Sequence, residues 1–274
     1  NVEAPRFLYG TAWKEERTQA LVETAIAAGF RGIDTANQRK HYHEAGAGNA
    51  IQQAIAQGAV TREQLFLQTK YTYAEGQDAR LPYDPGAGHP EQVRQSFESS
   101  LAHLGVERID SYLLHGPRSR SGLSSGDREV WRTMEEIQRE GRTRLIGVSN
   151  VTAEQLALLC GIAAVKPAFV QNRCFARSGW DRDVREVCRR EAIVYQGFSL
   201  LTANVAELES PLIGRIAAER GVSRTRVIFG FALQLGMICL TGTTDPEHMR
   251  DDLAALDFEL AEDEMAAIER LSSR

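Results

Sequence analysis

The chain has 274 residues, with 32 Lys and Arg against 37 Asp and Glu, so its formal net charge is −5. Hydrophobic residues make up 43% and charged residues 25%, which is ordinary for a globular protein. No stretch approaches 18 consecutive apolar residues, which argues against a membrane-spanning helix, and the mild acidic balance argues against nucleic-acid binding. The beginning, NVEAPRFLYG, has neither a basic nor an apolar signal region, so we expect a cytoplasmic protein.

The four cysteines are far apart and lack the C-x-x-C spacing of a redox or metal motif; they are Cys160, Cys174, Cys188 and Cys239. Free, buried thiols in a reducing compartment are the simplest expectation. No Cys or His pair has the spacing of zinc ligands, so no metal site is expected.

Short apolar or β-branched runs alternate with longer amphipathic stretches along the chain. The expected strands are residues 4–11, 32–34, 65–69, 109–114, 144–149, 169–171, 193–198 and 238–240. The expected helices are residues 16–28, 48–57, 91–104, 127–140, 153–160, 181–191, 211–220, 224–234, 246–256 and 261–271. Thr61 and Thr152 stand near capping-box spacing, and Gly29 and Gly105 stand where helices should end. Alternating strands and helices predict a parallel sheet.

Eight β/α units in 274 residues fit a single (β/α)8 TIM barrel with extra C-terminal helices, which is an α/β fold. The alternative is an open doubly wound sheet, but no G-x-G-x-x-G follows an early strand. Gly46, Ala47 and Gly48 come closest, and they open a helix after a loop. No Pro/Ser-rich linker divides the chain, so we expect one domain over residues 1–274.

Polar side chains stand at the carboxyl ends of six consecutive expected strands. They are Asp34, Lys70, His115, Ser149 with Asn150, Gln171 with Asn172, and Ser199. In a barrel these ends meet at one rim, the face on which active sites are built. A single polar strand end is usually a turn residue, but Asp, Lys and His together predict a catalytic site.

Several strings resemble the aldo-keto reductase superfamily in order and spacing over nearly the whole chain. They are FLYGTAW (7–13), GFRGIDTA (29–36), LFLQTK (65–70), LLHGP (113–117), GRTRLIGVSN (141–150), KPAFVQN (166–172) and GFSLL (197–201). The resemblance implies one barrel, a nicotinamide cofactor bound extended without a Rossmann domain, and reduction of an aldehyde or ketone to an alcohol.

The resemblance also implies a catalytic set of Asp, Tyr, Lys and His. Asp34, Lys70 and His115 match it directly, whereas the loop ANQRKHYHEAG is two residues longer than usual. Tyr42 is its only tyrosine, and we expect Tyr42 to be the proton donor. The rival interpretation gives that role to His41. Tyrosine is favoured because its proton is retained at neutral pH.

Physical chemistry explains why these residue types belong together. Negative charge grows on the carbonyl oxygen when hydride arrives, and a proton must follow. We expect the ammonium of Lys70 to lower the pKa of Tyr42, with Asp34 as the carboxylate that keeps Lys70 charged. A neutral His115 would orient the carbonyl. The alternative is an ion pair between Lys70 and Asp34 at the rim with no catalytic role, which leaves Tyr42 and His115 unexplained.

The cofactor positions follow from the resemblance. Ser149, Asn150 and Gln171 match residues that hydrogen-bond the nicotinamide carboxamide, and Phe198 replaces a tyrosine that stacks on the ring. Ser199 and Leu201 belong to the loop that passes the pyrophosphate.

At the adenosine end the chain departs from the family pattern. Gly242 replaces a Lys, Thr243 a Ser and His248 an Arg in LTGTTDPEHMRDDL. Thr243, Thr244, His248 and Arg250 would then partly substitute for the missing cations, and backbone N–H groups near Asp245 would also receive a 2′-phosphate. We therefore expect NADPH ahead of NADH.

The substrate is expected to be a small aldehyde, a sugar or a related polar carbonyl compound. Trp13, Tyr42 and His115 would line its pocket, together with the long loops 75–90 and 118–126. Loop residues that would favour a polar or anionic substrate are Arg80, Tyr83, His89, Arg118 and Arg120. Solvated surface positions are the favoured interpretation of the loop arginines. We expect a monomer or weak homo-oligomer; a cofactor-binding redox-sensing or regulatory subunit is the alternative function.

Overall fold

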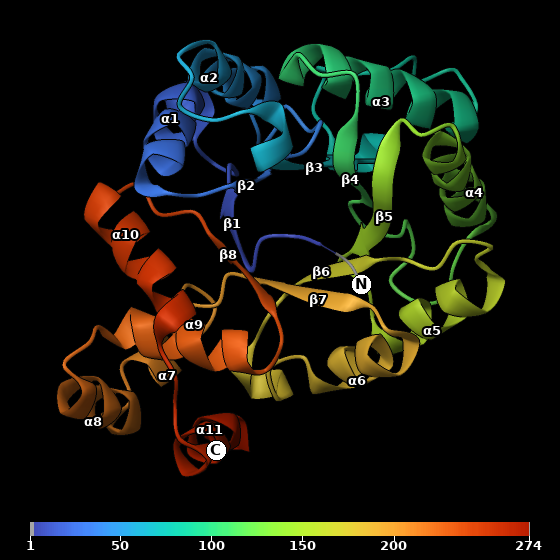
Figure 1. The fold of residues 1–274 in the computed structure, drawn as a ribbon. Helices are drawn as coiled ribbons and strands as arrows, with labels where there is room; N and C mark the ends of the chain where they lie inside the picture. Colours follow the sequence, from blue (N-terminus) through green and yellow to red (C-terminus); the bar gives the residue numbers. More distant parts are fainter. Residues whose placement is uncertain (1–2, 274) are drawn as a thin grey trace.

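Eight parallel strands close into a barrel in the computed structural model, which describes residues 3–273 (Figure 1). The strands are β1 Phe7–Gly10, β2 Gly32–Asp34, β3 Phe66–Tyr71, β4 Ile109–Leu114, β5 Thr143–Ser149, β6 Phe169–Arg173, β7 Val194–Phe198 and β8 Ile238–Thr241. They pair in chain order, and β1 pairs with β8 to close the ring. The expected (β/α)8 barrel is confirmed. Residues 1–2 and 274, the ends of the expected domain, lie outside the described residues.

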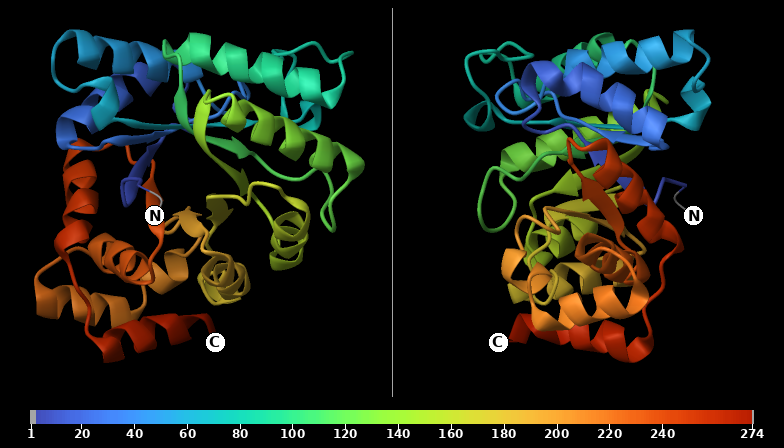
Figure 2. Two further views of the ribbon diagram at one scale, coloured as in Figure 1. Left: turned by 45° about the vertical axis from the view of Figure 1, so that its right-hand side comes forward. Right: turned by 90° about the vertical axis from the view of Figure 1, so that its left-hand side faces the viewer.

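Helices surround the barrel on all sides in Figures 1 and 2. They are α1 Thr18–Ala28, α2 Glu44–Ala56, α3 His89–Leu104, α4 Ser125–Arg139, α5 Ala153–Ile162, α6 Arg182–Glu191, α7 Val205–Leu208, α8 Pro211–Arg220, α9 Arg224–Gln234, α10 Pro246–Ala254 and α11 Glu262–Glu269. The expected C-terminal extra helix is α11, which packs against α8. The short α7 was not predicted from the pattern, because four residues carry no periodicity.

Local signals in the sequence set several of these boundaries. Thr152 forms the expected capping box with Gln155 at the start of α5. Gly29 and Gly105 end α1 and α3 with positive φ angles of 117° and 67°, backbone angles that residues with a Cβ rarely adopt.

Helix α2 begins at Glu44, four residues before the expected start at residue 48. Its first turns contain Gly46 and Gly48, which weaken the helical pattern in the sequence. Tertiary packing explains Gly48: a Cβ there would lie 1.9 Å from the carbonyl oxygen of His103 in α3. The glycine allows α2 and α3 to approach closely, at the cost of helix propensity.

The inside of the barrel has two layers of different character. Toward the amino ends the interior is apolar, because Phe66, Phe169 and Ile238 begin β3, β6 and β8. They belong to a cluster that also contains Leu8, Leu113 and Leu240, of which Leu240 reaches the carboxyl rim. Toward the carboxyl ends, buried polar side chains such as Asp34, Gln68 and Lys70 replace these apolar ones. The barrel is therefore closed at one end by hydrophobic packing and carries its charges at the other.

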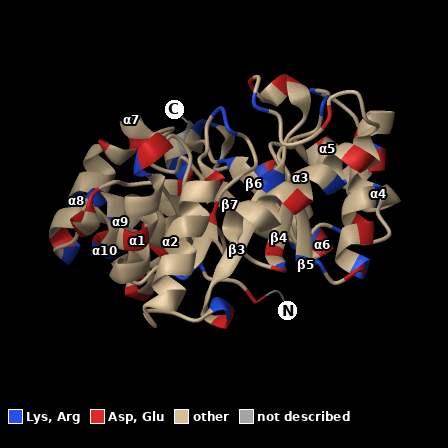
Figure 3. Cartoon of the chain, turned by 90° about the horizontal axis from the view of Figure 1, so that it is seen from above, with Lys and Arg blue, Asp and Glu red and all other residues tan. Residues whose placement is uncertain are grey.

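Acidic and basic positions are interspersed over the outer helices in Figure 3. None of the helices in the described part of the chain combines the length and apolar character needed to span a bilayer. All four cysteines are free and buried, as expected. Within residues 3–273, no cluster of three or more His, Cys, Asp or Glu side chains is arranged to hold a metal ion.

The close approach of α2 and α3 gives a stability prediction. Gly48→Ala should lower the free energy of unfolding by about 2 kcal/mol or more, because the new methyl group overlaps backbone atoms that cannot rotate away. Gly161→Ala in α5 is the matched control: nothing lies within 4 Å of its Cβ position, so helix propensity should stabilise it slightly. Urea unfolding of both variants measures the difference. Equal effects of the two substitutions would contradict the packing argument.

Candidate active site

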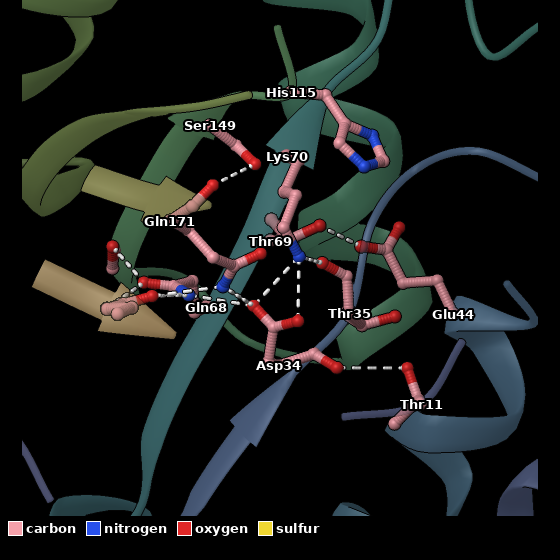
Figure 4. Close-up of polar contacts among 12 residues, drawn as sticks. Thr11, Asp34, Thr35, Glu44, Gln68, Thr69, Lys70, His115, Ser149 and Gln171 are labelled. Carbon is pink, nitrogen blue, oxygen red and sulfur yellow. Dashed lines mark hydrogen bonds and ion pairs between the residues drawn. The ribbon is translucent and has the colours of Figure 1, made fainter. Parts of the chain in front are cut away.

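An ion pair between Lys70 in β3 and Asp34 in β2 lies at the centre of the polar layer (Figure 4). Lys70 is 0% exposed, and its Nζ donates to Oδ1 and Oδ2 of Asp34 at 2.8 Å each and to the Thr35 carbonyl at 2.7 Å. Burial lowers the pKa of Lys70, and the charges of Asp34 and Glu44 oppose this shift. The expected ion pair is present, and all three ammonium protons are used within it.

Tyr42 stands beside this pair, in the loop before α2. Its ring centroid lies 5.4 Å from Lys70 Nζ and 5.9 Å from the ring of His115. Exclusion of water from its hydroxyl, followed by the charge of Asp34, raises the pKa of Tyr42 well above its usual range. The net shift is opposite to the lowering expected from Lys70, because burial raises the pKa of Tyr42 more strongly. Tyr42 therefore holds its proton firmly.

His115 follows β4 at the same rim. Its Nδ1 lies 2.7 Å from the Thr72 hydroxyl oxygen. Burial, followed by the positive charges of Lys70 and His41, lowers the pKa of His115 to about 3. The ring is therefore neutral at physiological pH. When the Thr72 hydroxyl donates to Nδ1, the ring proton lies on Nε2, which leaves a neutral N–H donor.

His41, the rival for the acid role, has different neighbours. Its ring stacks on Trp13 with centroids 4.0 Å apart, and its Nδ1 lies 2.9 Å from Oε1 of Gln38. The Trp13 backbone N–H donates to the His41 carbonyl at 2.7 Å. Burial, followed by the charge of Lys40, lowers the pKa of His41. The structure thus brings Tyr42 next to Lys70 and His115, and His41 next to Trp13, which is 68% exposed.

A cleft of about 990 Å³ opens over this rim. It contains most of the residues expected for cofactor and substrate: Trp13, Asp34, Tyr42, His115, Ser149, Asn150, Gln171, Phe198, Ser199, Leu201, Gly242, Thr243 and His248. Lys70 is buried beneath it. Thr244 is exposed and is not among the cleft-lining residues. Asn172, another polar strand end, is bonded to the Val151 backbone.

Two amide side chains present free oxygens at the cleft. Nδ2 of Asn150 donates to the His115 carbonyl at 2.8 Å and to Ser149 Oγ at 3.1 Å. Nε2 of Gln171 donates to Asp34 Oδ1 and to Gln196 Oε1, each at 3.0 Å. Within the described residues, neither Asn150 Oδ1 nor Gln171 Oε1 accepts a hydrogen bond. Two acceptors of this kind suit the N–H₂ group of a carboxamide.

Lys14 is a cleft residue that the sequence reasoning missed. It is 6% exposed, and its Nζ donates to the Gly242 carbonyl. A Cβ at Gly242 would lie 3.4 Å from this nitrogen, so Lys14 packs directly against position 242. Burial, followed by the charge of Arg17, lowers the pKa of Lys14. In the sequence, the position of Lys14 next to Trp13 and shortly after a buried strand could have indicated that it reaches the cleft.

The backbone N–H groups at the start of α10, which were expected to bind a phosphate, already have a hydrogen-bond acceptor. Oδ1 of Asp245 accepts the backbone N–H groups of Glu247 at 2.7 Å and His248 at 3.4 Å. These donors are therefore committed to a carboxylate, and the expectation that they receive a phosphate is not met. The side chains of Asp251 and Asp252 also line this end of the cleft. Burial raises the pKa of Asp252 to about 6.

The two long loops that were expected to line the substrate pocket do not line this cleft. Within the described residues, none from 75–90 or 118–126 is among those lining the cleft. Arg80 pairs with Asp78, and Arg118 pairs with Glu75. Tyr83 is buried, and its hydroxyl donates to the Thr72 carbonyl. Gly76 of the first loop accepts a hydrogen bond from Gln38, which lines the cleft, so this loop packs behind the lining rather than forming it.

Comparisons with known proteins agree with this architecture. The sequence model of the aldo/keto reductase family matches residues 8–273. An uncharacterized oxidoreductase of Bacillus subtilis, YtbE, is 31% identical over 273 residues, covering 99% of this chain and 90% of that protein. The NAD(P)H-dependent 6′-deoxychalcone synthase of Glycine max is 28% identical over 94% of this chain and 82% of its own. An aldo-keto reductase of Bombyx mori in complex with NADP superposes with a TM-score of 0.83 at 25% identity, covering 99% and 90% of the two chains.

A (β/α)8 barrel with its ionisable residues gathered at the carboxyl rim has the organisation of a barrel enzyme. The chain belongs to the aldo/keto reductase family. Members of this family are oxidoreductases that generally reduce carbonyl groups with a nicotinamide cofactor.

The Lys70–Asp34 pair predicts a strong coupling in stability. Lys70→Met should lower the free energy of unfolding by about 3–5 kcal/mol, because it leaves a buried carboxylate without its cation. The double variant Lys70→Met/Asp34→Asn should lose less than the sum of the two single variants. Urea unfolding of the four proteins measures the coupling. Simple additivity of the two single effects would show that the pair is not coupled.

Proposed function

We propose that the chain is an NAD(P)H-dependent reductase of aldehydes or ketones, with Tyr42 as the proton donor. The observation that carries this proposal is the grouping of Tyr42, Lys70, Asp34 and a neutral His115 at one rim below a cofactor-sized cleft. A rim ion pair alone would not require a tyrosine and a histidine beside it.

The cleft suits a nicotinamide dinucleotide. The free oxygens of Asn150 and Gln171 are acceptors for the carboxamide, and Phe198 offers an aromatic face beside them. Ser149 would support both Asn150 and Gln171, since its hydroxyl accepts from Asn150 and donates to the Gln171 backbone carbonyl at 2.6 Å. Ser199 and Leu201 would contact the pyrophosphate. The reduced cofactor, when bound, supplies the hydride.

The protein residues have distinct roles in this proposal. The neutral His115 donates to the substrate carbonyl oxygen and orients it. Tyr42 then transfers its proton to the oxygen as negative charge develops there. Lys70 stabilises the resulting phenolate, and Asp34 keeps Lys70 protonated despite its burial. The raised pKa of Tyr42 ensures that the proton is present when the substrate arrives.

Tyr42→Phe tests the assignment of the acid. It should lower kcat by about 10²–10⁴-fold, since general acid catalysis is removed, while cofactor affinity changes little. Turnover is followed as loss of NADPH or NADH absorbance with a panel of aldehydes and sugars. His41→Ala is the matched control and should keep most of kcat. A mild effect of Tyr42→Phe together with a crippling effect of His41→Ala would reverse the two roles.

For the substrate we propose a small aldehyde, a sugar or a related polar carbonyl compound. Trp13, stacked on His41, forms an exposed aromatic edge of the cleft near Tyr42 and His115. The Gln38 side chain also lines it, so both an apolar face and polar groups are available to a substrate. We further propose one domain over residues 1–274, a cytoplasmic location and a monomer or weak homo-oligomer. A regulatory subunit that binds cofactor without turnover is the second candidate; the long Tyr42 loop favours it.

For the cofactor we propose NADPH ahead of NADH, with weak discrimination. Thr243 and His248 line the adenosine end and suit a 2′-phosphate, but the carboxylates of Glu247, Asp251 and Asp252 stand around them. Nearby negative charge opposes a phosphate dianion, so the preference should be small.

His248→Arg tests this balance. Dissociation constants from fluorescence titration of the wild type should differ by less than about tenfold between NADPH and NADH. His248→Arg should tighten NADPH binding about fivefold or more and leave NADH binding nearly unchanged, because arginine adds a permanent cation for the phosphate. Arg250→Gln, outside the cleft lining, is the control and should leave the ratio unchanged. A wild-type preference of 100-fold or more for either cofactor would contradict weak discrimination.

A further inference from the structure

A chain of buried amide side chains lies below the Lys70–Asp34 pair, inside the barrel. Gln68 of β3 and Gln196 of β7 are both 0% exposed. Strands β3 and β7 are four apart in the closed ring of eight, so they face each other across the interior. The two glutamines bond to each other twice: Gln68 Nε2 donates to Gln196 Oε1 at 2.8 Å, and Gln196 Nε2 donates to Gln68 Oε1 at 3.0 Å. We call this pair the glutamine bridge.

The glutamine bridge is connected to both ends of the proposed site. Gln68 Nε2 also donates to Asp34 Oδ1 at 2.7 Å (Figure 4). Gln196 Oε1 also accepts from Gln171 Nε2 at 3.0 Å. Ser111 completes the network by donating its hydroxyl to Gln68 Oε1 at 2.8 Å. Asp34 and Gln171, a residue of the acid–base group and a residue of the cofactor cleft, are thus joined by one set of buried hydrogen bonds.

The orientation of every amide in this network follows from Asp34. An ionised carboxylate only accepts hydrogen bonds, so both Gln68 and Gln171 must turn their NH₂ groups toward it. Their NH₂ groups in turn require that Gln196 presents its oxygen to both. Gln171 is then left with its oxygen directed away from the network. A free Gln171 could rotate its amide by half a turn and present NH₂ groups instead.

We infer that the glutamine bridge positions the site: it holds Asp34 against Lys70 and fixes the amide of Gln171 so that its Oε1 is available to the cofactor carboxamide. This inference rests on the proposed function, because the cofactor role of Gln171 belongs to it. Gln68 and Gln196 touch neither the cleft nor a reacting group, so they are positioning residues. Their polarity is costly in a barrel interior unless the groups are bonded, and here each amide nitrogen and oxygen of the two glutamines has at least one partner.

The first test removes the bridge while preserving its volume. In Gln68→Met/Gln196→Met both partners of the bridge become apolar, so their bonds to each other are removed together. The Ser111 hydroxyl loses its acceptor on Gln68, so the melting temperature should fall moderately, and cofactor binding is measured well below the melting temperature of the variant. Dissociation constants for NADPH and NADH, measured by fluorescence titration, should weaken about fivefold, as expected for loss of one well-oriented hydrogen bond. The KM for substrate should change less than kcat, which should fall about tenfold.

A second variant gives a signature that a merely structural role lacks. In Gln196→Glu the protonated carboxyl group accepts from Gln68 and Gln171 and donates to Gln68 Oε1, which reproduces the bridge. After ionisation it loses the donor and repels Gln68 Oε1. Burial raises the pKa of such a carboxyl group, so the change falls in an accessible pH range. Cofactor affinity of this variant should fall as pH rises from 5 to 9, relative to the wild type measured over the same range.

Other titratable groups around Asp34 are the same in both proteins of that comparison. They are Lys70 from β3, Tyr42 and Glu44 before and in α2, and His115 after β4. These groups affect cofactor affinity equally in both proteins. The ratio of the variant's dissociation constant to that of the wild type therefore reports the introduced carboxyl group.

Gln92→Met is the matched control. Gln92 is a buried glutamine of α3 that accepts from the Tyr71 hydroxyl at 3.2 Å, outside the network. It should leave cofactor affinity unchanged. Wild-type cofactor affinity in the double Met variant, or a pH-independent affinity ratio in Gln196→Glu, would overturn the inference. These readouts are binding measurements, so they remain decisive even where the wild type reduces none of the carbonyl compounds tried, an outcome that would reject the proposed function instead.

Discussion

The rest of the site depends on a single buried ammonium group. Lys70 has no contact with water, and its charge survives only because Asp34 and the Thr35 carbonyl accept its three protons. This requirement explains why the barrel interior changes from apolar to polar along its axis. Asp34 must be fixed by further donors, and these donors must themselves be satisfied. A polar layer that crosses the barrel is the consequence.

The same constraint separates what is rigid from what is adaptable. Lys70, Asp34 and the amides below them come from strands, so their positions are set by the closed barrel. Tyr42, His41 and Trp13 come from loops above it, where stacking and single hydrogen bonds hold them. The buried ion pair and the amides thus stand on strands, while the aromatic residues at the edge of the cleft stand on loops.

Much of the fold was predictable because strand and helix patterns are local. Every expected strand was found, with ends shifted by a few residues, and the polar strand ends predicted the rim. The early start of α2 was not predictable, since Gly48 is explained only by the backbone of α3. The sequence left two roles open for the loop arginines, and the structure pairs Arg80 and Arg118 with nearby acidic residues at the surface.

The amino-acid sequence by itself determined the barrel, the family and the residue types at the rim, because alternation, strand ends and motif spacing are written along the chain. Only the tertiary structure decided which groups meet. Gln68 and Gln196 are 128 residues apart, and no periodicity links them; barrel closure makes them partners. It likewise brings Lys14 to Gly242 and turns the Tyr42 ring, rather than that of His41, toward Lys70. Long-range contacts of this kind arise from packing, and local sequence carries no record of them.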